Sequence, residues 1–167
     1  KNAGVTLNSA YLRPRSRGTV RLQSADAFAA PLIDPNYWSD PHDRQMSLAG
    51  LRLARKIMRQ AALKPFVQRE VLPGTDVESD AALIDYAGQS AKTDHHPVGT
   101  CKMGIDEMAV VSPDLKVRGV PGLRVCDSSI MPAIPSCNTN APTVMCGEKG
   151  ADLILGNSPL APMNLAN

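Results

Sequence analysis

Prolines and glycines interrupt residues 93–140 so often that only short segments of regular structure are expected there. The stretch opens with Thr-Asp-His-His-Pro-Val-Gly-Thr and closes with Ser-Cys-Asn-Thr-Asn. Between these ends, apolar residues separated by turns predict three short strands, at residues 109–111, 115–118 and 123–127. Short strands beside helices predict an α+β fold, with a mostly antiparallel sheet and the helices on one face.

A helix is predicted directly after this stretch, over residues 141–155. Asn140 is its expected N-cap, Pro142 suits its first turn, and Gly156 is a stop signal. The free N–H groups and the positive end of the helix dipole are therefore expected within reach of Asn138.

Two further helices are predicted upstream. The first starts at Pro41 after an Asp40 cap and continues to residue 63 as an amphipathic surface helix. The second lies within residues 76–91, with Ser79 as its N-cap.

The segments around the start of the first helix carry several open interpretations. Residues 19–24 alternate polar and apolar side chains, which predicts a half-buried strand. Residues 13–18 contain three arginines, which form either a phosphate clamp or, as we favour, a solvated turn bonded to nearby carbonyls. Residues 31–38 are expected to be extended, because proline biases its predecessor away from helix. Trp38 either lines a substrate pocket or fills the seam between the sheet and a helix, and His42 is expected to face solvent.

The composition is that of a soluble globular protein, with 43% hydrophobic and 20% charged residues among 167. The net charge of +2 gives no basis for binding nucleic acid or an anionic membrane. The sequence contains no run of eighteen apolar residues, so no membrane span is predicted. The first residues do not have the features of a secretion signal. The four cysteines lack zinc-site spacing, and we interpret Cys126 and Cys146 as buried free thiols. Cys101 and Cys137 lie in the 93–140 stretch, where a catalytic thiol is the alternative to the favoured interpretation of packing residues. Free thiols predict a reducing, cytoplasmic location.

Two residues at the ends of the 93–140 stretch could carry chemistry. His96 can exchange protons near neutral pH, and the adjacent His95 points the opposite way in an extended chain. The carboxamide of Asn138 can donate to a negative oxygen. Taken alone, each has a structural alternative: a loop histidine is more often structural, and Asn-Thr-Asn is a good helix start.

Three longer segments decide between these interpretations. Residues 96–104 read HPVGTCKMG, residues 117–132 read VRGVPGLRVCDSSIMP, and residues 138–145 read NTNAPTVM. They resemble the carboxy-terminal part of the glucose–methanol–choline (GMC) oxidoreductases, and the last is most similar to the choline-dehydrogenase-like branch. Residues 13–22 and 31–37 also resemble that family, in the same order along the chain.

The resemblance implies an FAD enzyme that oxidises a small-molecule alcohol to an aldehyde or ketone. It implies that His96 accepts the hydroxyl proton, that a hydride passes to flavin N5, and that Asn138 donates to the substrate oxygen. The implied cofactor contacts are Asp127, Asn138 and the backbone of Thr139. The candidates for the substrate pocket are His95 and Trp38.

The resemblance also implies a longer protein. No GxGxxG motif opens a strand–helix unit here, so the Rossmann domain that binds most of the FAD is expected in a missing N-terminal part. The lack of a first Met suggests a fragment or a trimmed product, and without the FAD domain such a fragment is expected to be inactive alone. We predict a substrate-binding cap domain over residues 1–117, a strand and helix that return to the FAD domain over residues 118–157, and an extended tail over residues 158–167. Without the FAD domain, strand 123–127 would be an open edge, which predicts a homodimer of the fragment.

Two other functions are compatible with parts of the sequence. The chain could be a non-catalytic binding or structural module that keeps the cap-domain fold without the chemistry. It could instead be a metal-dependent hydrolase that uses Asp94, His95 and His96. Three consecutive residues seldom converge on one metal, and no HExxH spacing exists, so we expect no metal site.

Overall fold

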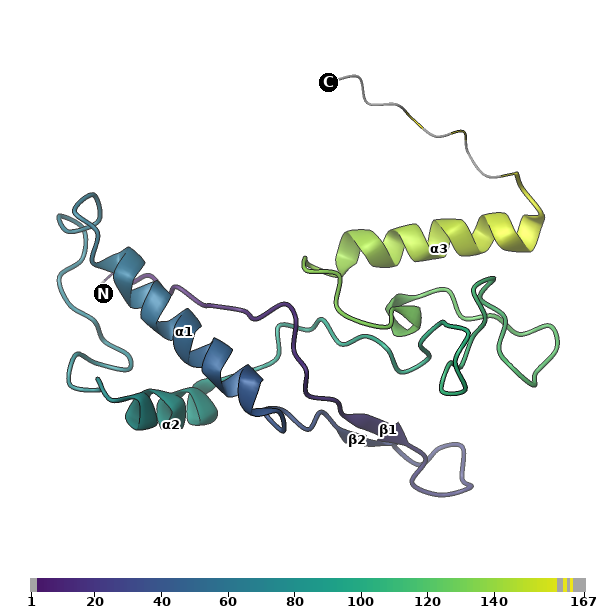
Figure 1. Ribbon diagram of the computed structural model, residues 1–167, viewed down its shortest axis with the longest axis horizontal. Helices are drawn as coiled ribbons and strands as arrows, with labels where there is room; N and C mark the ends of the chain where they lie inside the picture. Colours follow the sequence, from purple (N-terminus) through teal and green to yellow (C-terminus); the bar gives the residue numbers. More distant parts are fainter. Residues whose placement is uncertain (1–2, 159–160, 162, 164–167) are drawn as a thin grey trace. The chain divides into compact units, whose positions relative to one another are not determined.

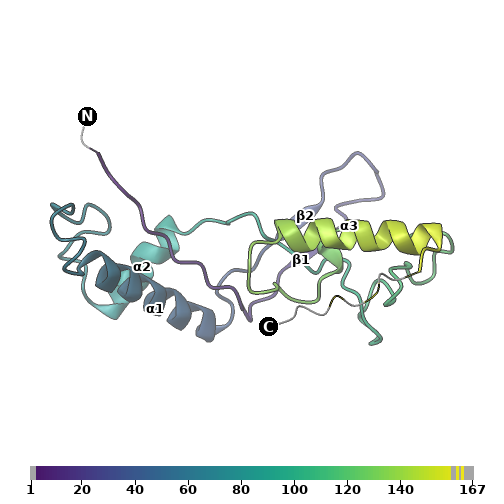
Figure 2. The same cartoon turned by 90° about the horizontal axis from the view of Figure 1, so that it is seen from above.

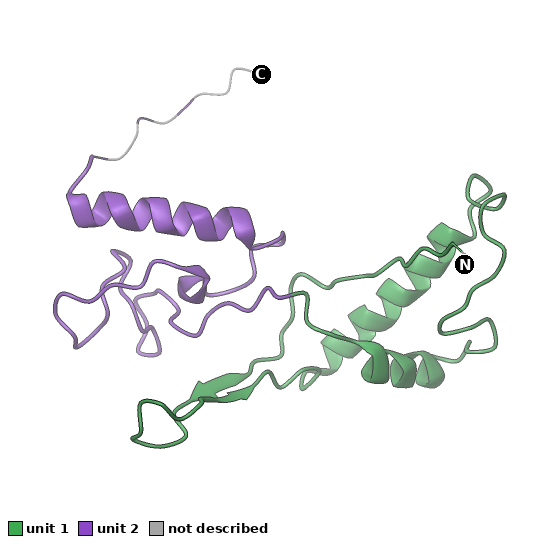
Figure 3. Ribbon diagram, turned by 180° about the vertical axis from the view of Figure 1, so that it is seen from behind, with its two compact units in different colours: residues 1–94 green, residues 95–167 purple. Residues whose placement is uncertain are grey.

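The computed structural model describes residues 3–158, 161 and 163 (Figure 1). The chain forms two compact units, unit 1 (Lys1–Asp94) and unit 2 (His95–Asn167), which Figure 3 shows in different colours. The predicted division at residue 117 concerns the way a longer enzyme is built, and it stays a prediction. Most of the predicted tail over residues 158–167 lies outside the described residues.

Unit 1 begins with a two-stranded antiparallel hairpin. Strand β1 (Thr19–Arg21) pairs with β2 (Leu32–Asp34), with Val20 opposite Ile33. The side chains of Val20 and Ile33 are 49% and 66% exposed, so the prediction of a half-buried strand is wrong for this unit. The reason is that no other described helix or strand packs against the hairpin.

Helix α1 (Pro41–Met58) begins as the sequence predicts. The Asp40 side chain accepts the backbone N–H of His42 at 2.8 Å, and Pro41 occupies the first helical position. The helix ends at Met58, several residues before the predicted end. There the side-chain amide of Gln60 donates to the carbonyl of Lys56, so the backbone N–H of Gln60 turns to Ile57 instead.

Helix α2 (Asp80–Ser90) starts after its predicted cap, since the Ser79 hydroxyl accepts the N–H of Ala82. Figures 1 and 2 show α2 beside α1, and Leu83 is almost fully buried in the unit, at 1% exposure. The indole of Trp38 donates to the hydroxyl of Ser47 on α1 at 3.1 Å. The same ring lies against Gly88 of α2, where an added methyl group would come within 3.4 Å. Trp38 therefore packs against both helices.

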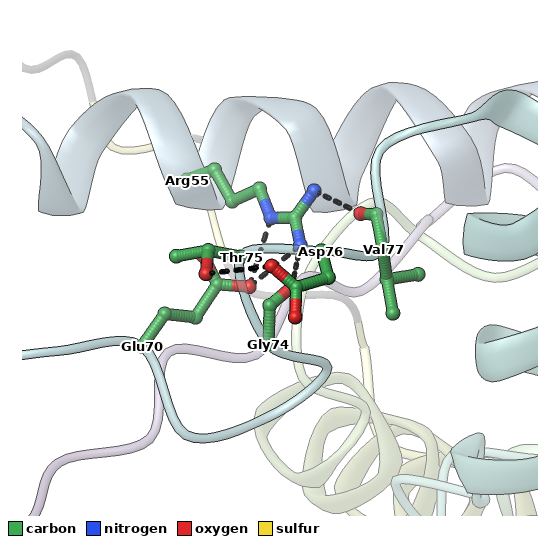
Figure 4. A network of polar contacts seen from close by, with 6 residues as sticks. All are labelled: Arg55, Glu70, Gly74, Thr75, Asp76 and Val77. Carbon is green, nitrogen blue, oxygen red and sulfur yellow. Dashed lines mark hydrogen bonds and ion pairs between the residues drawn. The ribbon is translucent and has the colours of Figure 1, made fainter.

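The segment that joins the two helices is tied to α1 by Arg55 (Figure 4). The guanidinium donates twice to one carboxylate oxygen of Glu70, at 2.9 and 2.7 Å. It also donates to the carbonyls of Val77 at 2.6 Å and Gly74 at 2.7 Å. Its side chain is only 14% exposed, so these bonds are partly shielded from water. One residue of the basic helix face thus holds a loop that has no regular structure of its own.

Buried polar contacts also fix the arginine-rich turn at residues 13–18. Asp43, in the first turn of α1, is 4% exposed and accepts the backbone N–H groups of Arg15 and Ser16 and the Ser16 hydroxyl. Arg17 donates to the carbonyls of Pro14 and Ser16, which confirms the interpretation of a turn bonded to its own carbonyls.

His42 does not face solvent as predicted. It is half-buried, and its Nε2 lies 2.8 Å from the hydroxyl of Tyr11, because the chain before the hairpin passes beside the start of α1.

The core of unit 2 forms beneath the last helix. Its buried side chains are Val111, Leu115, Ile130, Met131 and Cys146. The 3-10 helix η1 (Ser128–Ile130) contacts helix α3 (Asn140–Leu155), which ends at Gly156 in the left-handed conformation as predicted. Of the described helices, none has the length and apolar character needed to cross a membrane.

The three strands predicted in unit 2 do not form. Among the described residues of unit 2, strand pairing is limited to single bridges between Met103 and Val111, Val111 and Val117, and Lys116 and Arg124. Leu115 has a φ of 65°, which bends the chain too sharply for a continuous ladder. The Arg118 and Arg124 guanidiniums instead bond main-chain carbonyls of neighbouring turns. The fold is α+β, but its regular sheet is the two-stranded hairpin of unit 1 rather than a larger antiparallel sheet. Because no strand forms at residues 123–127, the open strand edge that was expected there is absent. The homodimer therefore stays a prediction and has lost the argument on which it was based.

The four cysteines are free thiols, as predicted. Cys146 is buried as predicted, but Cys126 is only half-buried, so the prediction of burial is wrong for Cys126. Burial raises the pKa of the Cys146 thiol. Gly150 lies directly against Cys126, because an added methyl group would come within 2.4 Å of its sulfur.

Candidate functional site

His96 lies at the beginning of unit 2 and contacts the start of α3. Its ring nitrogen Nδ1 is 2.9 Å from the Thr139 hydroxyl oxygen, and the backbone N–H of Thr139 points at the same nitrogen from 3.5 Å. His96 is half-buried, and Thr139 is only 6% exposed. This hydrogen bond joins the two ends of the stretch from which the sequence predicts the chemistry.

The segment after His96 is held by backbone hydrogen bonds to η1. The N–H of Cys101 donates to the carbonyl of Ser129 at 3.0 Å, and that of Met103 to Ile130 at 2.8 Å. Gly99 has a φ of 89°, and an added methyl group there would lie 3.2 Å from the carbonyl oxygen of Met131. Glycine at this position therefore permits both the turn and the close approach of the two chains.

Asp127 fixes the turn to which the His96 segment is bonded. Its Oδ1 accepts the backbone N–H of Ser129 at 2.8 Å and the Ser129 hydroxyl at 2.5 Å, and so caps η1. These local bonds give the Asp127 carboxylate a structural role. Its implied contact with a cofactor stays a prediction.

The N-cap of α3 is Thr139, so the prediction of Asn140 is wrong. The first helical bond runs from the N–H of Thr143 to the carbonyl of Thr139, which places Asn140 inside the helix. Thr139 has φ −78° and ψ −7°, and its side chain makes no capping bond. A capping threonine commonly stabilises a helix by about 1 kcal/mol. Here the hydroxyl bonds His96 instead.

Asn138 is the residue directly before Thr139, and its side chain is exposed. The structure therefore brings the Asn138 segment to the His96 segment, through the bond that Thr139 makes. The N–H groups of Asn140 and Ala141 lie in the first turn and have no partner within α3, while Pro142 has no N–H to offer. A carboxamide and a helix amino terminus are a set of donors suited to an electron-rich group.

The two predicted pocket residues, His95 and Trp38, belong to different units. His95 is exposed and has a φ of 62°, an uncommon value for a residue other than glycine. Trp38 belongs to unit 1, where its indole packs against α1 and α2. The place of both in a substrate pocket stays a prediction.

Sequence reasoning missed the hydroxyl of Thr139, which it assigned only a backbone role. The available signal was a threonine immediately before a helix that starts with Asn-Ala-Pro. Within the described part of the chain, no group of three or more His, Cys, Asp or Glu residues could hold a metal ion.

Comparison with known proteins identifies one family across most of the chain. The model of the GMC oxidoreductase family matches residues 14–147. The chain is 43% identical over 161 residues to an alcohol dehydrogenase [acceptor] of Pseudomonas putida, covering 96% of the chain and 29% of that relative. It is 48% identical over 160 residues to an oxygen-dependent choline dehydrogenase of Klebsiella pneumoniae (strain 342), with the same coverage of 96% and 29%.

Solved structures show the same likeness. Pyridoxine 4-oxidase from Mesorbium loti superposes with a TM-score of 0.82 at 34% identity, over 89% of this chain and 29% of that chain. A fungal aryl-alcohol oxidase superposes with a TM-score of 0.75 at 37% identity, over 87% of this chain and 24% of that chain. The chain therefore spans less than a third of the length of these relatives.

Proposed function

The chain belongs to the GMC oxidoreductase family, whose members are FAD-dependent flavoproteins, and we propose that it supplies the alcohol-activating part of such an enzyme. The supporting observation is the hydrogen bond between His96 Nδ1 and Thr139 Oγ1. That bond unites an imidazole with the segment that carries Asn138, although 43 positions separate His96 from Thr139. His96 and Asn138 are the residues that the family resemblance implies for contact with the substrate oxygen.

His96 would act as the proton acceptor for the alcohol. Since Nδ1 is engaged with Thr139, Nε2 is the nitrogen left to receive the hydroxyl proton. Loss of that proton makes the carbinol carbon a better hydride donor. The imidazolium and the Asn138 carboxamide would then stabilise the negative charge that develops on the oxygen. A donor placed in this way commonly contributes about 2.7–4 kcal/mol to the transition state.

The residues at the start of α3 fit the electron-rich edge of a flavin. Thr139 leaves the first turn without a side-chain cap, and the N–H groups of Asn140 and Ala141 face outward from the helix end. When bound, FAD would supply the acceptor for the hydride, at its N5 atom. We assign the contacts with its ring to Asn138 and the Thr139 backbone, with Asp127 nearby. The positive end of the α3 dipole would favour added negative charge on the ring.

The rest of the flavin site is proposed to come from another part of a longer protein. Apolar side chains on α3 support this, since Val144, Met145 and Ile154 are 57%, 59% and 64% exposed. We propose that residues 118–157 return to that FAD domain, and that residues 1–117 form the cap domain that covers the substrate. The chain alone would then lack turnover.

The substrate class is proposed to be small-molecule alcohols. The relatives named above are an alcohol dehydrogenase, a choline dehydrogenase, a pyridoxine oxidase and an aryl-alcohol oxidase. A test is to purify the full-length protein with FAD and to offer choline, pyridoxine, benzyl alcohol and short aliphatic alcohols. Oxygen and an artificial dye would serve in turn as electron acceptors.

We expect at least one alcohol to bleach the flavin absorbance and to yield the matching aldehyde. Bound flavin with no reduction by any alcohol would count against this function and favour a non-catalytic module.

A further inference from the structure

The Thr139 hydroxyl occupies an unusual place for a helix N-cap. A threonine in this position normally accepts an N–H of its own helix, and that bond is absent from α3. The hydroxyl instead lies 2.9 Å from Nδ1 of His96. Thr139 itself is only 6% exposed. A bond shielded from water in this way holds its geometry more firmly than a surface bond.

From this geometry we propose that Thr139 is a positioning residue: its hydroxyl holds the His96 ring by Nδ1 and presents Nε2 to the alcohol. This inference rests on the function proposed above, and it adds a side chain to which neither the family resemblance nor the sequence assigned a part.

A hydroxyl suits this task because its oxygen can accept a hydrogen bond. Nε2 can take the alcohol proton only when the ring hydrogen is on Nδ1, and the hydroxyl oxygen can accept that Nδ1–H both before and after the transfer. The backbone N–H of Thr139 also points at Nδ1, but an N–H can only donate. The hydroxyl is therefore the group of Thr139 that can keep the ring in place after His96 gains the substrate proton.

The competing interpretation is that the bond merely ties a loop to a helix. A simple tie would change stability without changing the rate of chemistry in the folded enzyme. Positioning would change that rate, because a reacting group displaced by about 1 Å can lose about 100-fold in rate.

The test compares T139V, which keeps the shape and removes the hydroxyl, with T139S, which keeps the hydroxyl. T143V is the matched control, since the Thr143 hydroxyl lies one turn further along and donates to the carbonyl of Thr139 rather than to His96. Anaerobic flavin reduction is measured in the full-length holoenzyme, together with flavin content. The ¹⁵N shifts of the His96 ring are measured by NMR in the 167-residue chain.

We expect T139V to slow flavin reduction about 10- to 100-fold with flavin content unchanged. T139S should restore most of the lost rate, and T143V should reduce it less than about threefold. The Nδ1 resonance of His96 should move in T139V and return in T139S. Should T139V fail to fold, T139A removes the same hydroxyl with a smaller side chain.

Two results would overturn the inference. One is an Nδ1 resonance that T139V leaves in place, which would mean that the bond does not exist. The other is a T139V enzyme that reduces flavin as fast as its parent. Failure of the proposed function is a different result, in which the parent enzyme itself reduces no flavin with any alcohol.

Discussion

Replacing Asp43 with asparagine removes a charge on which the start of α1 and the arginine-rich turn both depend. Oδ2 of Asp43 accepts the N–H of Ser16 at 2.8 Å and its hydroxyl at 2.6 Å, and an amide NH₂ in that position cannot accept either. Hydrogen bonds to a charged group contribute about 1.5–3 kcal/mol each. Oδ1 can keep its bond from Arg15, so we expect D43N to lower the free energy of unfolding of unit 1 by about 3 kcal/mol.

The effect of D43N should depend on pH with a definite sign. Burial by itself raises the pKa of the Asp43 carboxyl, but the bonds from Arg15 and Ser16 outweigh it and hold the pKa below its ordinary value. Such a carboxylate stabilises the folded state fully above the pKa of the unfolded chain, about 3.9. The stabilisation is lost as the pH falls through the lower, folded-state pKa. The difference between parent and D43N should therefore be constant near neutrality and shrink in acid.

Urea unfolding followed by tryptophan fluorescence measures this directly, because the chain has one tryptophan, Trp38, and it packs against α1 and α2 in unit 1. D26N is the matched control, since Asp26 is exposed and accepts a single backbone N–H, from Phe28. We expect that control to change stability by less than about 0.5 kcal/mol. A cost below about 1 kcal/mol for D43N, or a difference that grows in acid, would refute the reasoning.

Three further substitutions test other contacts. G150A should lower the free energy of unfolding by about 1–3 kcal/mol in thermal melts, because its methyl group would come within 2.4 Å of the Cys126 sulfur; an unchanged melting temperature would contradict that close approach. R55M should release the loop before α2, seen as faster amide hydrogen exchange over residues 70–77, and equal exchange in parent and variant would show that the guanidinium does not hold it. The side chain of Lys116, followed by the Ser112 hydroxyl, lowers the pKa of Asp114 to about 2, so K116M should raise that pKa toward its ordinary value in a carboxyl NMR titration. An Asp114 titration unmoved by K116M would exclude the ion pair.

Local chemistry made the helices of unit 1 predictable. Asp40 as the N-cap and Pro41 at the first helical position mark the start of α1, and Ser79 as the N-cap marks the start of α2. The end of α1 was not predictable in this way, because it depends on the Gln60 side chain reaching the Lys56 carbonyl.

Unit 2 shows why the strands were predicted wrongly. Apolar segments between turns give the same pattern whether they pair as strands or pack as loops, and the pattern does not report the positive φ of Leu115. The deciding contacts are guanidinium bonds from Arg118 and Arg124 to distant carbonyls, which no local rule reveals.

The roles of the site residues stay predictions, but the structure adds a contact that the sequence did not reveal. The family resemblance pointed to His96 and Asn138, and the structure brings their segments together. The bond itself is made by Thr139, where capping chemistry competes with a long-range partner. A sequence rule for helix starts favours the cap, and tertiary structure favours the imidazole.

The rate of flavin reduction in an H96A holoenzyme tests the central claim most directly. The full-length protein would be mixed anaerobically with its best alcohol, and H42A would serve as control, since it deletes an imidazole that bonds Tyr11 in unit 1. We predict that H96A keeps its flavin but slows reduction by about 10²- to 10⁴-fold, the usual contribution of a general base, while H42A stays near the parent rate. An H96A enzyme that reduces flavin at close to the parent rate would contradict the proton-accepting role of His96.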